Sequence, residues 1–92
     1  MDQDIRRRRL AFRAWHRGTR EADFLVGGFF DRYGAQWDDA ELGWFEAIIE
    51  EQDVDILSWA FGRTDPPLAL LGPIGAPLIA ALRKLDYIDI PR

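Results

Sequence analysis

Apolar residues recur at helical spacing along most of this chain, and glycine, proline and acidic residues break them into five segments. The first predicted helix begins at Asp2 or Asp4, either of which can cap it, and runs to Arg17. Its apolar residues on one side are Ile5, Phe12 and Trp15, with Leu10, Ala11 and Ala14 beside them. The spacing indicates an amphipathic helix.

The second predicted helix covers residues 19–33 and has a broader apolar stripe than the first. This stripe consists of Ala22, Leu25, Val26, Phe29, Phe30 and Tyr33. Gly27 and Gly28 lie inside the helix, where each costs about 1 kcal/mol relative to alanine. We interpret them as a point of close helix packing rather than as a flat surface for a partner. Gly34 is the predicted stop.

The third predicted helix begins with a capping box, in which Asp38 caps and Glu41 lies three residues on. Its inward residues are Leu42, Phe45, Ile48 and Ile49, with Trp44 at the margin and Glu46, Glu50 and Glu51 facing water. A short fourth helix at residues 56–61 follows Asp53 and Asp55 and ends at Gly62.

An irregular connection rich in proline and glycine covers residues 63–75. The fifth predicted helix starts at Ala76 or Pro77 and runs to Leu85. Its inward residues are Leu78, Ile79, Leu82 and Leu85. Residues 87–90 are predicted to form a short extended tail. The fold class predicted for residues 1–92 is therefore all-α, a single domain built as a compact bundle of about five short helices.

The corner between the first two helices is the most informative stretch. Gly18 suits the residue just past a helix end, because glycine adopts positive φ without a Cβ clash. Thr19 can cap the next helix, and Glu21 falls in its first turn, where the helix dipole favours an acid. Arg17 and Arg20 have no such structural reason. Guanidinium groups and a carboxylate around a tight turn also suit docking of a polar partner, so both interpretations stay open.

The formal net charge of −4 conceals a strong asymmetry along the chain. Residues 1–20 hold seven arginines and two aspartates, a net +5, whereas residues 21–65 are net −10 and residues 66–92 net +1. This polarity orients encounters with a charged partner and argues against coating of nucleic acid. The run Arg6–Arg9 fans around the helix axis, and it is either a solvated first turn or a binding segment.

Composition excludes several classes of site. The chain has no cysteine and one histidine, which excludes disulfides, thiolate chemistry and a multi-histidine metal site. His16 is the only candidate imidazole base and Ser58 the only serine, and we interpret His16 as an exposed helix-end residue. The four tryptophans are many for this length, and one or two, such as Trp59 with Phe61, are expected at the surface as an interface.

No apolar run approaches the roughly 20 residues needed to span a bilayer, and no signal peptide is recognisable. We therefore expect a soluble protein of a reducing compartment such as the cytoplasm, without membrane insertion.

Three sequence blocks resemble a known family. Arg9-Leu10, Phe12-Arg13 and the run Arg17-Gly18-Thr19-Arg20-Glu21 with Asp23 resemble the RGxxE signature of the SdhE family, also called succinate dehydrogenase assembly factor 2. Asp38-Asp39-x-Glu41 and Asp53-x-Asp55-Ile56-Leu57-x-Trp59 are similar to its second and third blocks. The likeness covers about residues 6–62. Residues 63–92 match less well, and His16 stands where many relatives carry arginine.

The resemblance implies an assembly factor that is not itself an enzyme. Such a factor binds the flavoprotein subunit of succinate dehydrogenase, or of fumarate reductase in some bacteria, and promotes covalent attachment of FAD. The FAD then belongs to the client, and this chain binds no cofactor or metal stably. The partner-binding residues carried over from the family's motif and its neighbours are Arg17, Gly18, Glu21, Arg20, Asp23, Arg13 and Arg9.

The residues agree with a binding role, because the chain offers a polar corner and lacks acid–base machinery, and a chaperone can act by positioning its client. A monomer that does not bind nucleic acid is expected. The alternative is a small regulatory or antitoxin-like protein that binds through the Arg6–Arg9 segment.

Overall fold

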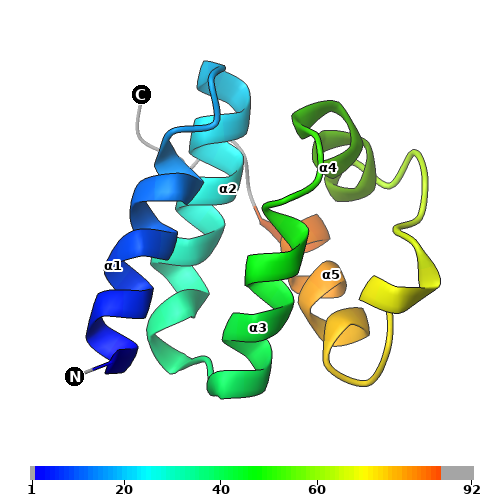
Figure 1. The fold of residues 1–92 in the computed structure, drawn as a ribbon. Helices are drawn as coiled ribbons and strands as arrows, with labels where there is room; N and C mark the ends of the chain where they lie inside the picture. The colour runs from blue at the N-terminus through cyan, green and yellow to red at the C-terminus, as the bar shows by residue number, and fades with distance from the viewer. Residues whose placement is uncertain (1, 86–92) are drawn as a thin grey trace. The chain divides into compact units, whose positions relative to one another are not determined.

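The computed structural model describes residues 2–85, which fall into two compact units: a first unit up to Trp37 and a second unit, Asp38–Leu85. The first unit contains α1 (Asp2–Trp15), α2 (Arg20–Tyr33) and the 3-10 turn η1 (Gly34–Gln36). The second contains α3 (Asp39–Ile48), α4 (Asp53–Ala60), the 3-10 turn η2 (Leu68–Leu70) and α5 (Gly75–Lys84). Within residues 2–85 there is no β-strand, and the predicted all-α fold with about five short helices is confirmed (Figure 1).

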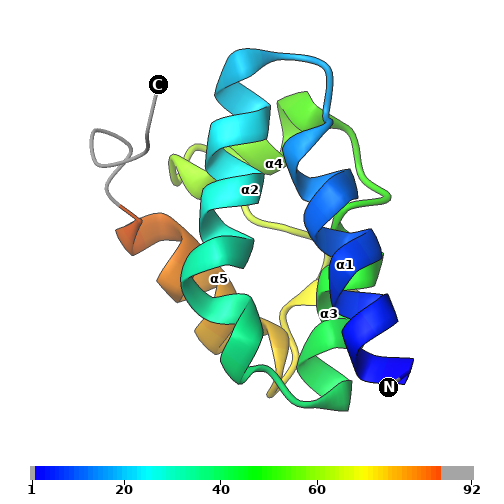
Figure 2. The same cartoon turned by 90° about the vertical axis from the view of Figure 1, so that its left-hand side faces the viewer.

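The first unit is built on an antiparallel pair, in which α1 and α2 lie side by side (Figure 2). The predicted stripe of α2 is confirmed: Ala22, Leu25, Val26, Phe29 and Phe30 are all buried, and Tyr33 is half-buried. The prediction for α1 needs correction. Leu10 and Ala14, one turn apart, are its buried residues, whereas Ile5 and Phe12 are 50% and 64% exposed. The helix also ends at Trp15 rather than at Arg17.

Gly27 marks the closest approach of the two helices. A Cβ at this position would lie 2.7 Å from Cγ of Trp15 and closer still to other atoms of the indole, so only glycine leaves room for the ring. The interpretation of this glycine as a point of close packing is confirmed. Trp15 also stacks edge-on against Phe24 and donates a hydrogen bond from Nε1 to Asp31 at 3.2 Å.

The α2 helix stops at Tyr33, as predicted, but Gly34 does not stop it by adopting positive φ. Its backbone is right-handed (φ −62°, ψ −31°) and continues into η1. Glycine is needed for space, because a Cβ at this position would lie 2.7 Å from the ring of Phe30. Trp37 follows η1 and is buried against Phe29 and Phe30, with ring centroids 5.4 and 5.8 Å apart.

The second unit begins with the predicted capping box. The Asp38 carboxylate accepts a hydrogen bond from the Glu41 backbone N–H at 2.9 Å, and the Glu41 carboxylate accepts one from the Asp38 N–H at 2.9 Å. The predicted inward residues of α3 are all buried: Leu42, Phe45, Ile48 and Ile49. Of the three glutamates predicted to face water, Glu46 in α3 and Glu51 after it are half-buried, and only Glu50 is exposed.

Two tryptophans of the second unit are more deeply buried than the sequence predicts. Trp44 was expected at the margin, but it is 7% exposed, and its Nε1 donates a hydrogen bond to the Leu70 carbonyl at 3.0 Å. Trp59 was expected at the surface and is 5% exposed. Phe61, its suggested neighbour at an interface, is 52% exposed. The indole of Trp44 thus contacts a segment 26 residues further along the chain.

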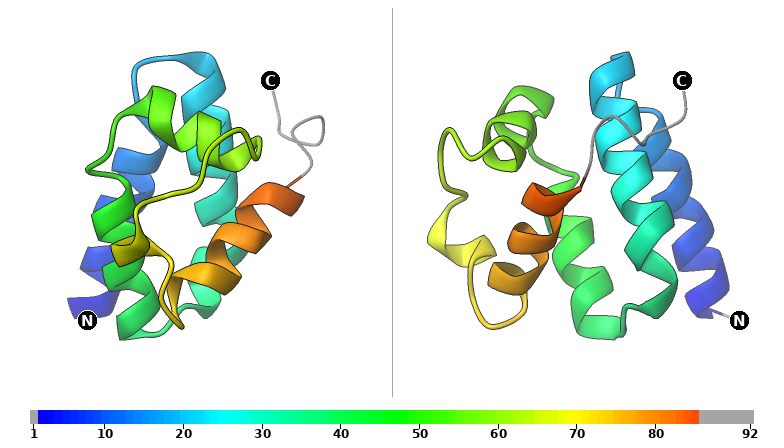
Figure 3. Two further views of the ribbon diagram at one scale, coloured as in Figure 1. Left: turned by 90° about the vertical axis from the view of Figure 1, so that its right-hand side faces the viewer. Right: turned by 180° about the vertical axis from the view of Figure 1, so that it is seen from behind.

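Residues 61–74 join α4 to α5 through η2, and α4 and α5 contact each other (Figure 3). The α4 helix ends before Gly62, whose φ of +73° fits the predicted stop. In α5, Leu78, Ile79 and Leu82 are buried as predicted. The helix ends at Lys84, one residue before the predicted end, and Leu85 is half-buried. The tail predicted for residues 87–90 lies outside the described residues. The prediction of a single domain stays a prediction.

Candidate functional site

The turn that joins α1 to α2 holds the motif residues of the corner. Gly18 has φ +115°, a conformation that side-chain-bearing residues rarely adopt, and a Cβ there would meet no atom within 4 Å. Thr19 is extended (φ −130°, ψ 152°), and its hydroxyl accepts a hydrogen bond from the Ala22 backbone N–H at 3.2 Å. The predicted N-cap is confirmed. The turn therefore needs glycine for its backbone shape and leaves open space above it.

Asp23 fixes this turn from the inner side. Its Oδ1 accepts hydrogen bonds from the backbone N–H groups of Arg17, at 2.5 Å, and of Gly18, at 3.2 Å. The side chain is half-buried. Sequence reasoning placed Asp23 among the partner-binding residues and missed this internal role. The only available signal was an acid in the first turns of α2, close to the backbone of the preceding loop.

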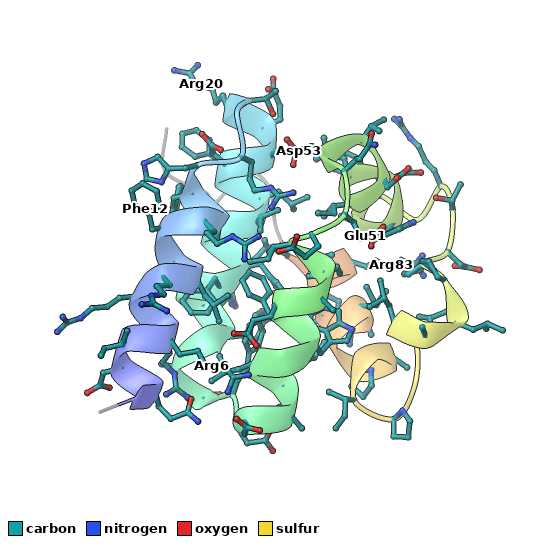
Figure 4. The ribbon with its side chains drawn as sticks, in the orientation of Figure 1. Arg6, Phe12, Arg20, Glu51, Asp53 and Arg83 are labelled. Atoms are coloured by element: carbon teal, nitrogen blue, oxygen red, sulfur yellow. The ribbon has the colours of Figure 1, made fainter. Side chains whose placement is uncertain are left out.

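Glu21 and Arg20 face outward from the start of α2. Both side chains are exposed, and Glu21 lies in the first helical turn, where the positive end of the dipole stabilises a carboxylate. The Arg20 guanidinium lies 6.0 Å from the centroid of the Phe24 ring. Figure 4 shows Arg20 extending away from the helix end. Arg17, at the beginning of the turn, is half-buried. An accessible carboxylate and an accessible guanidinium thus lie next to each other where the turn enters α2.

Arg9 and Arg13 lie on α1, one helical turn apart, and both are exposed. They share the outward side of this helix with Phe12 and His16. The His16 ring stacks on Phe12 with centroids 3.9 Å apart and an interplanar angle of 16°. Its Nδ1 is 2.6 Å from the Phe12 carbonyl oxygen. Sequence reasoning missed this exposed ring pair, because it assigned Phe12 to the apolar side of the helix.

His16 is exposed, in agreement with its interpretation as a helix-end residue. Ser58 hydrogen-bonds within the second unit, where its hydroxyl lies 2.8 Å from the Thr64 hydroxyl. Within residues 2–85, no three histidine or acidic side chains are placed to hold a metal ion. None of the helices in the same residues is both long and apolar enough to cross a membrane.

The four consecutive arginines of α1 have different environments. Arg7 reaches the end of α2 and η1, where its Nε donates to the Gly34 carbonyl at 3.3 Å and its Nη2 to the Trp37 carbonyl at 2.5 Å. A cation at the carboxyl end of a helix is favoured by the dipole, so Arg7 stabilises the first unit. Arg6 is half-buried, and Arg8 and Arg9 are exposed. The run is therefore not one uniform basic surface.

Comparison with known proteins gives a consistent result. Residues 8–85 match the family model Sdh5, described as flavinator of succinate dehydrogenase. The chain is 47% identical to the FAD assembly factor SdhE of Acetobacter pasteurianus over 62 residues, which cover 67% of this chain and 57% of the relative. It is 35% identical to the FAD assembly factor SdhE of Ralstonia nicotianae over 80 residues, 87% of this chain and 83% of the relative.

A eukaryotic relative is also similar. The mitochondrial succinate dehydrogenase assembly factor 2 of Cryptococcus neoformans is 31% identical over 83 residues, 90% of this chain and 46% of the relative. The chain thus spans about half the length of this relative and of the Acetobacter protein. The matched region of the family model includes the turn, α2 and the helices of the second unit. The chain belongs to the Sdh5 family, the family described as flavinator of succinate dehydrogenase.

Proposed function

We propose that this chain is an assembly factor that binds the flavoprotein subunit of succinate dehydrogenase and promotes the covalent attachment of FAD to it. One observation carries the proposal: the motif from Arg17 to Glu21 forms an exposed turn in a member of the Sdh5 family, and Asp23 holds that turn from within. The flavoprotein subunit of fumarate reductase is a second client to be tested in the same way.

The chain is proposed to act by positioning and not as an enzyme. Covalent attachment requires a client histidine to meet the 8α-methyl carbon of the flavin, and holding the client in the reactive geometry raises the rate without any acid or base from the factor. A rigid turn suits this task, because its groups lose little conformational freedom on binding. Glu21 and Arg20 supply opposite charges, and Gly18 allows the client backbone to approach closely. FAD stays with the client throughout.

The test is co-expression of this chain with the flavoprotein subunit in a host that lacks its own factor, followed by in-gel fluorescence of protein-bound flavin. We expect strong fluorescence with the wild-type chain and at least about a tenfold loss with Glu21→Gln, which removes the carboxylate charge at nearly constant size. The magnitude is that of a charged interface residue removed from its partner.

Asp55→Asn is the matched control, because Asp55 is also an exposed acid in the first turn of a helix, α4. Both changes remove a similar favourable interaction with a helix dipole, so their effects on stability should be alike. Only Glu21→Gln should affect flavin attachment. Equal fluorescence with and without the wild-type chain would refute the assembly function, and normal attachment with Glu21→Gln would refute the role of the turn.

A further inference from the structure

The outward side of α1 carries a surface that the motif turn does not include. Six exposed residues form it, and we call it the outer face of α1: Ile5, Arg8, Arg9, Phe12, Arg13 and His16. They follow helical spacing, so they project on one side of the helix from its first turn to the residue after its end. Figure 4 shows Phe12 projecting outward from α1 on this side.

Two large apolar side chains are exposed on this face. Ile5 is 50% and Phe12 is 64% exposed, and they lie seven positions, or two helical turns, apart along α1. Phe12 is also held in place, since the His16 ring stacks on it at 3.9 Å. An exposed aromatic ring that is already ordered loses little entropy on binding, which is the property of an interface anchor. Exposed apolar patches on a folded surface often mark contact sites.

The charged side chains of α1 within one helical turn of Phe12 are all positive, whereas the acid Asp4 directly precedes Ile5. Arg8, Arg9 and Arg13 are exposed beside Ile5 and Phe12, and the sequence has no acidic residue between Ile5 and Arg20. A complementary partner surface therefore carries carboxylates around an apolar pocket. Nucleic acid fits less well, because the chain as a whole has net charge −4 and Arg7 is engaged with the carbonyls of Gly34 and Trp37.

We propose that the outer face of α1 is a second docking surface for the flavoprotein client, in which Phe12 enters an apolar pocket rimmed by acidic side chains. The inference rests on the function proposed above. It is supported by continuity, because His16 is followed directly by Arg17 of the motif turn. One client surface can thus contact the turn and the helix that leads into it. The arginines then select an acidic rim, and Phe12 supplies the apolar contact.

The experiment measures binding of the full chain to the purified, flavin-free flavoprotein subunit by isothermal titration calorimetry. Phe12→Ala is compared with Phe61→Ala, a matched control at an exposed phenylalanine of the second unit that also lies near an arginine, Arg63. Phe12→Ala should weaken binding about tenfold or more, Phe12→Leu less, and Phe61→Ala less than about twofold. The triple change of Arg8, Arg9 and Arg13 to Gln should reduce the dependence of binding on salt.

Circular dichroism melting of each variant checks that the fold is retained. If Phe12→Ala binds like wild type while Glu21→Gln binds weakly, the second surface is refuted and the assembly function stands. If the wild-type chain does not bind the client at all, both proposals fail. Sedimentation at increasing protein concentration tests whether the outer face of α1 instead binds a second copy of this chain. If the wild type self-associates and Phe12→Ala abolishes this self-association, the inference is overturned.

Discussion

Asp23 and Gly18 are joined by a hydrogen bond of 3.2 Å from the backbone N–H of Gly18 to the Asp23 carboxylate. The same oxygen accepts a second bond from the backbone N–H of Arg17. These contacts assign different tasks to two acids of one motif region. Asp23 is directed at the backbone and shapes the turn, whereas Glu21 is exposed and available to a partner. Variants of Asp23 should therefore lower stability, whereas variants of Glu21 should weaken binding of the partner.

Asp23→Ala should lower the free energy of unfolding by about 1–2 kcal/mol, because two backbone donors lose a charged acceptor at a half-buried site. Asp23→Asn keeps an oxygen acceptor and should cost roughly half as much. Chemical denaturation measures both. Flavin attachment should fall with Asp23→Ala in proportion to the loss of the ordered turn. A stability unchanged in both variants would show that the carboxylate does not fix the turn.

Gly18→Ala should cost about 1–3 kcal/mol, because φ +115° is strained for any residue with a Cβ. Gly18→Arg meets the same strain, and its Cβ, like that of alanine, has no atom within 4 Å. The two variants should thus melt alike, while Gly18→Arg flavinylates the client less than Gly18→Ala because its side chain fills the space above the turn.

Gly62 gives the control for these two variants, since it also has positive φ, +73°, and open space around its Cβ position. Gly62→Arg should lose stability and keep flavin attachment once protein amounts are matched. If Gly18→Arg flavinylates as well as Gly18→Ala, the space above the turn is not used by the client.

Gly27→Ala should destabilise the first unit by about 1–3 kcal/mol, although alanine is the better helix former, because the methyl group collides with the Trp15 indole. Thermal melting monitors the change. In a Trp15→Leu background the cost should shrink, since the ring is gone. Gly72→Ala is the control: its Cβ would meet nothing within 4 Å, and its stability should change by less than about 0.5 kcal/mol.

Arg7→Ala should cost about 1–2 kcal/mol, because two carbonyls at the end of α2 and η1 lose a charged donor. Arg8→Ala, at an exposed neighbouring position, should change stability by less than about 0.5 kcal/mol. Urea denaturation measures the stability of both variants.

The same two variants test the alternative function through gel shifts with duplex DNA at low salt. A gel shift by the wild type that Arg8→Ala weakens would favour a nucleic-acid-binding role.

Arg83→Ala should lower the stability of the second unit by about 1–2 kcal/mol. Its guanidinium donates to the Trp59 carbonyl at 2.8 Å, to the Thr64 carbonyl at 3.0 Å and to the Asp65 carboxylate at 3.0 Å. Arg83→Lys should lose less stability than Arg83→Ala but more than none, because one ammonium group cannot make all the hydrogen bonds of the guanidinium. Asp65→Ala removes only the ion pair, whose acid is 79% exposed, and should cost less than about 0.5 kcal/mol. Equal losses for Arg83→Ala and Asp65→Ala would contradict this order.

The sequence by itself determined the local features of this protein. The helices, the Thr19 cap and the capping box of Asp38 and Glu41 were all predictable, because each depends on residues three or four positions apart. The position of the motif turn was predictable for the same reason. Its role in binding a client is a prediction that only experiment tests.

Only the tertiary structure decided which side of α1 is buried, and with it the exposure of Phe12. It also decided the hydrogen-bond partners of Arg7 and Trp44, because each partner lies 26 to 30 residues further along the chain. Spacing within a helix shows that a side chain lies on one face. It does not show which segment covers that face, because burial depends on contacts between elements that are distant in sequence.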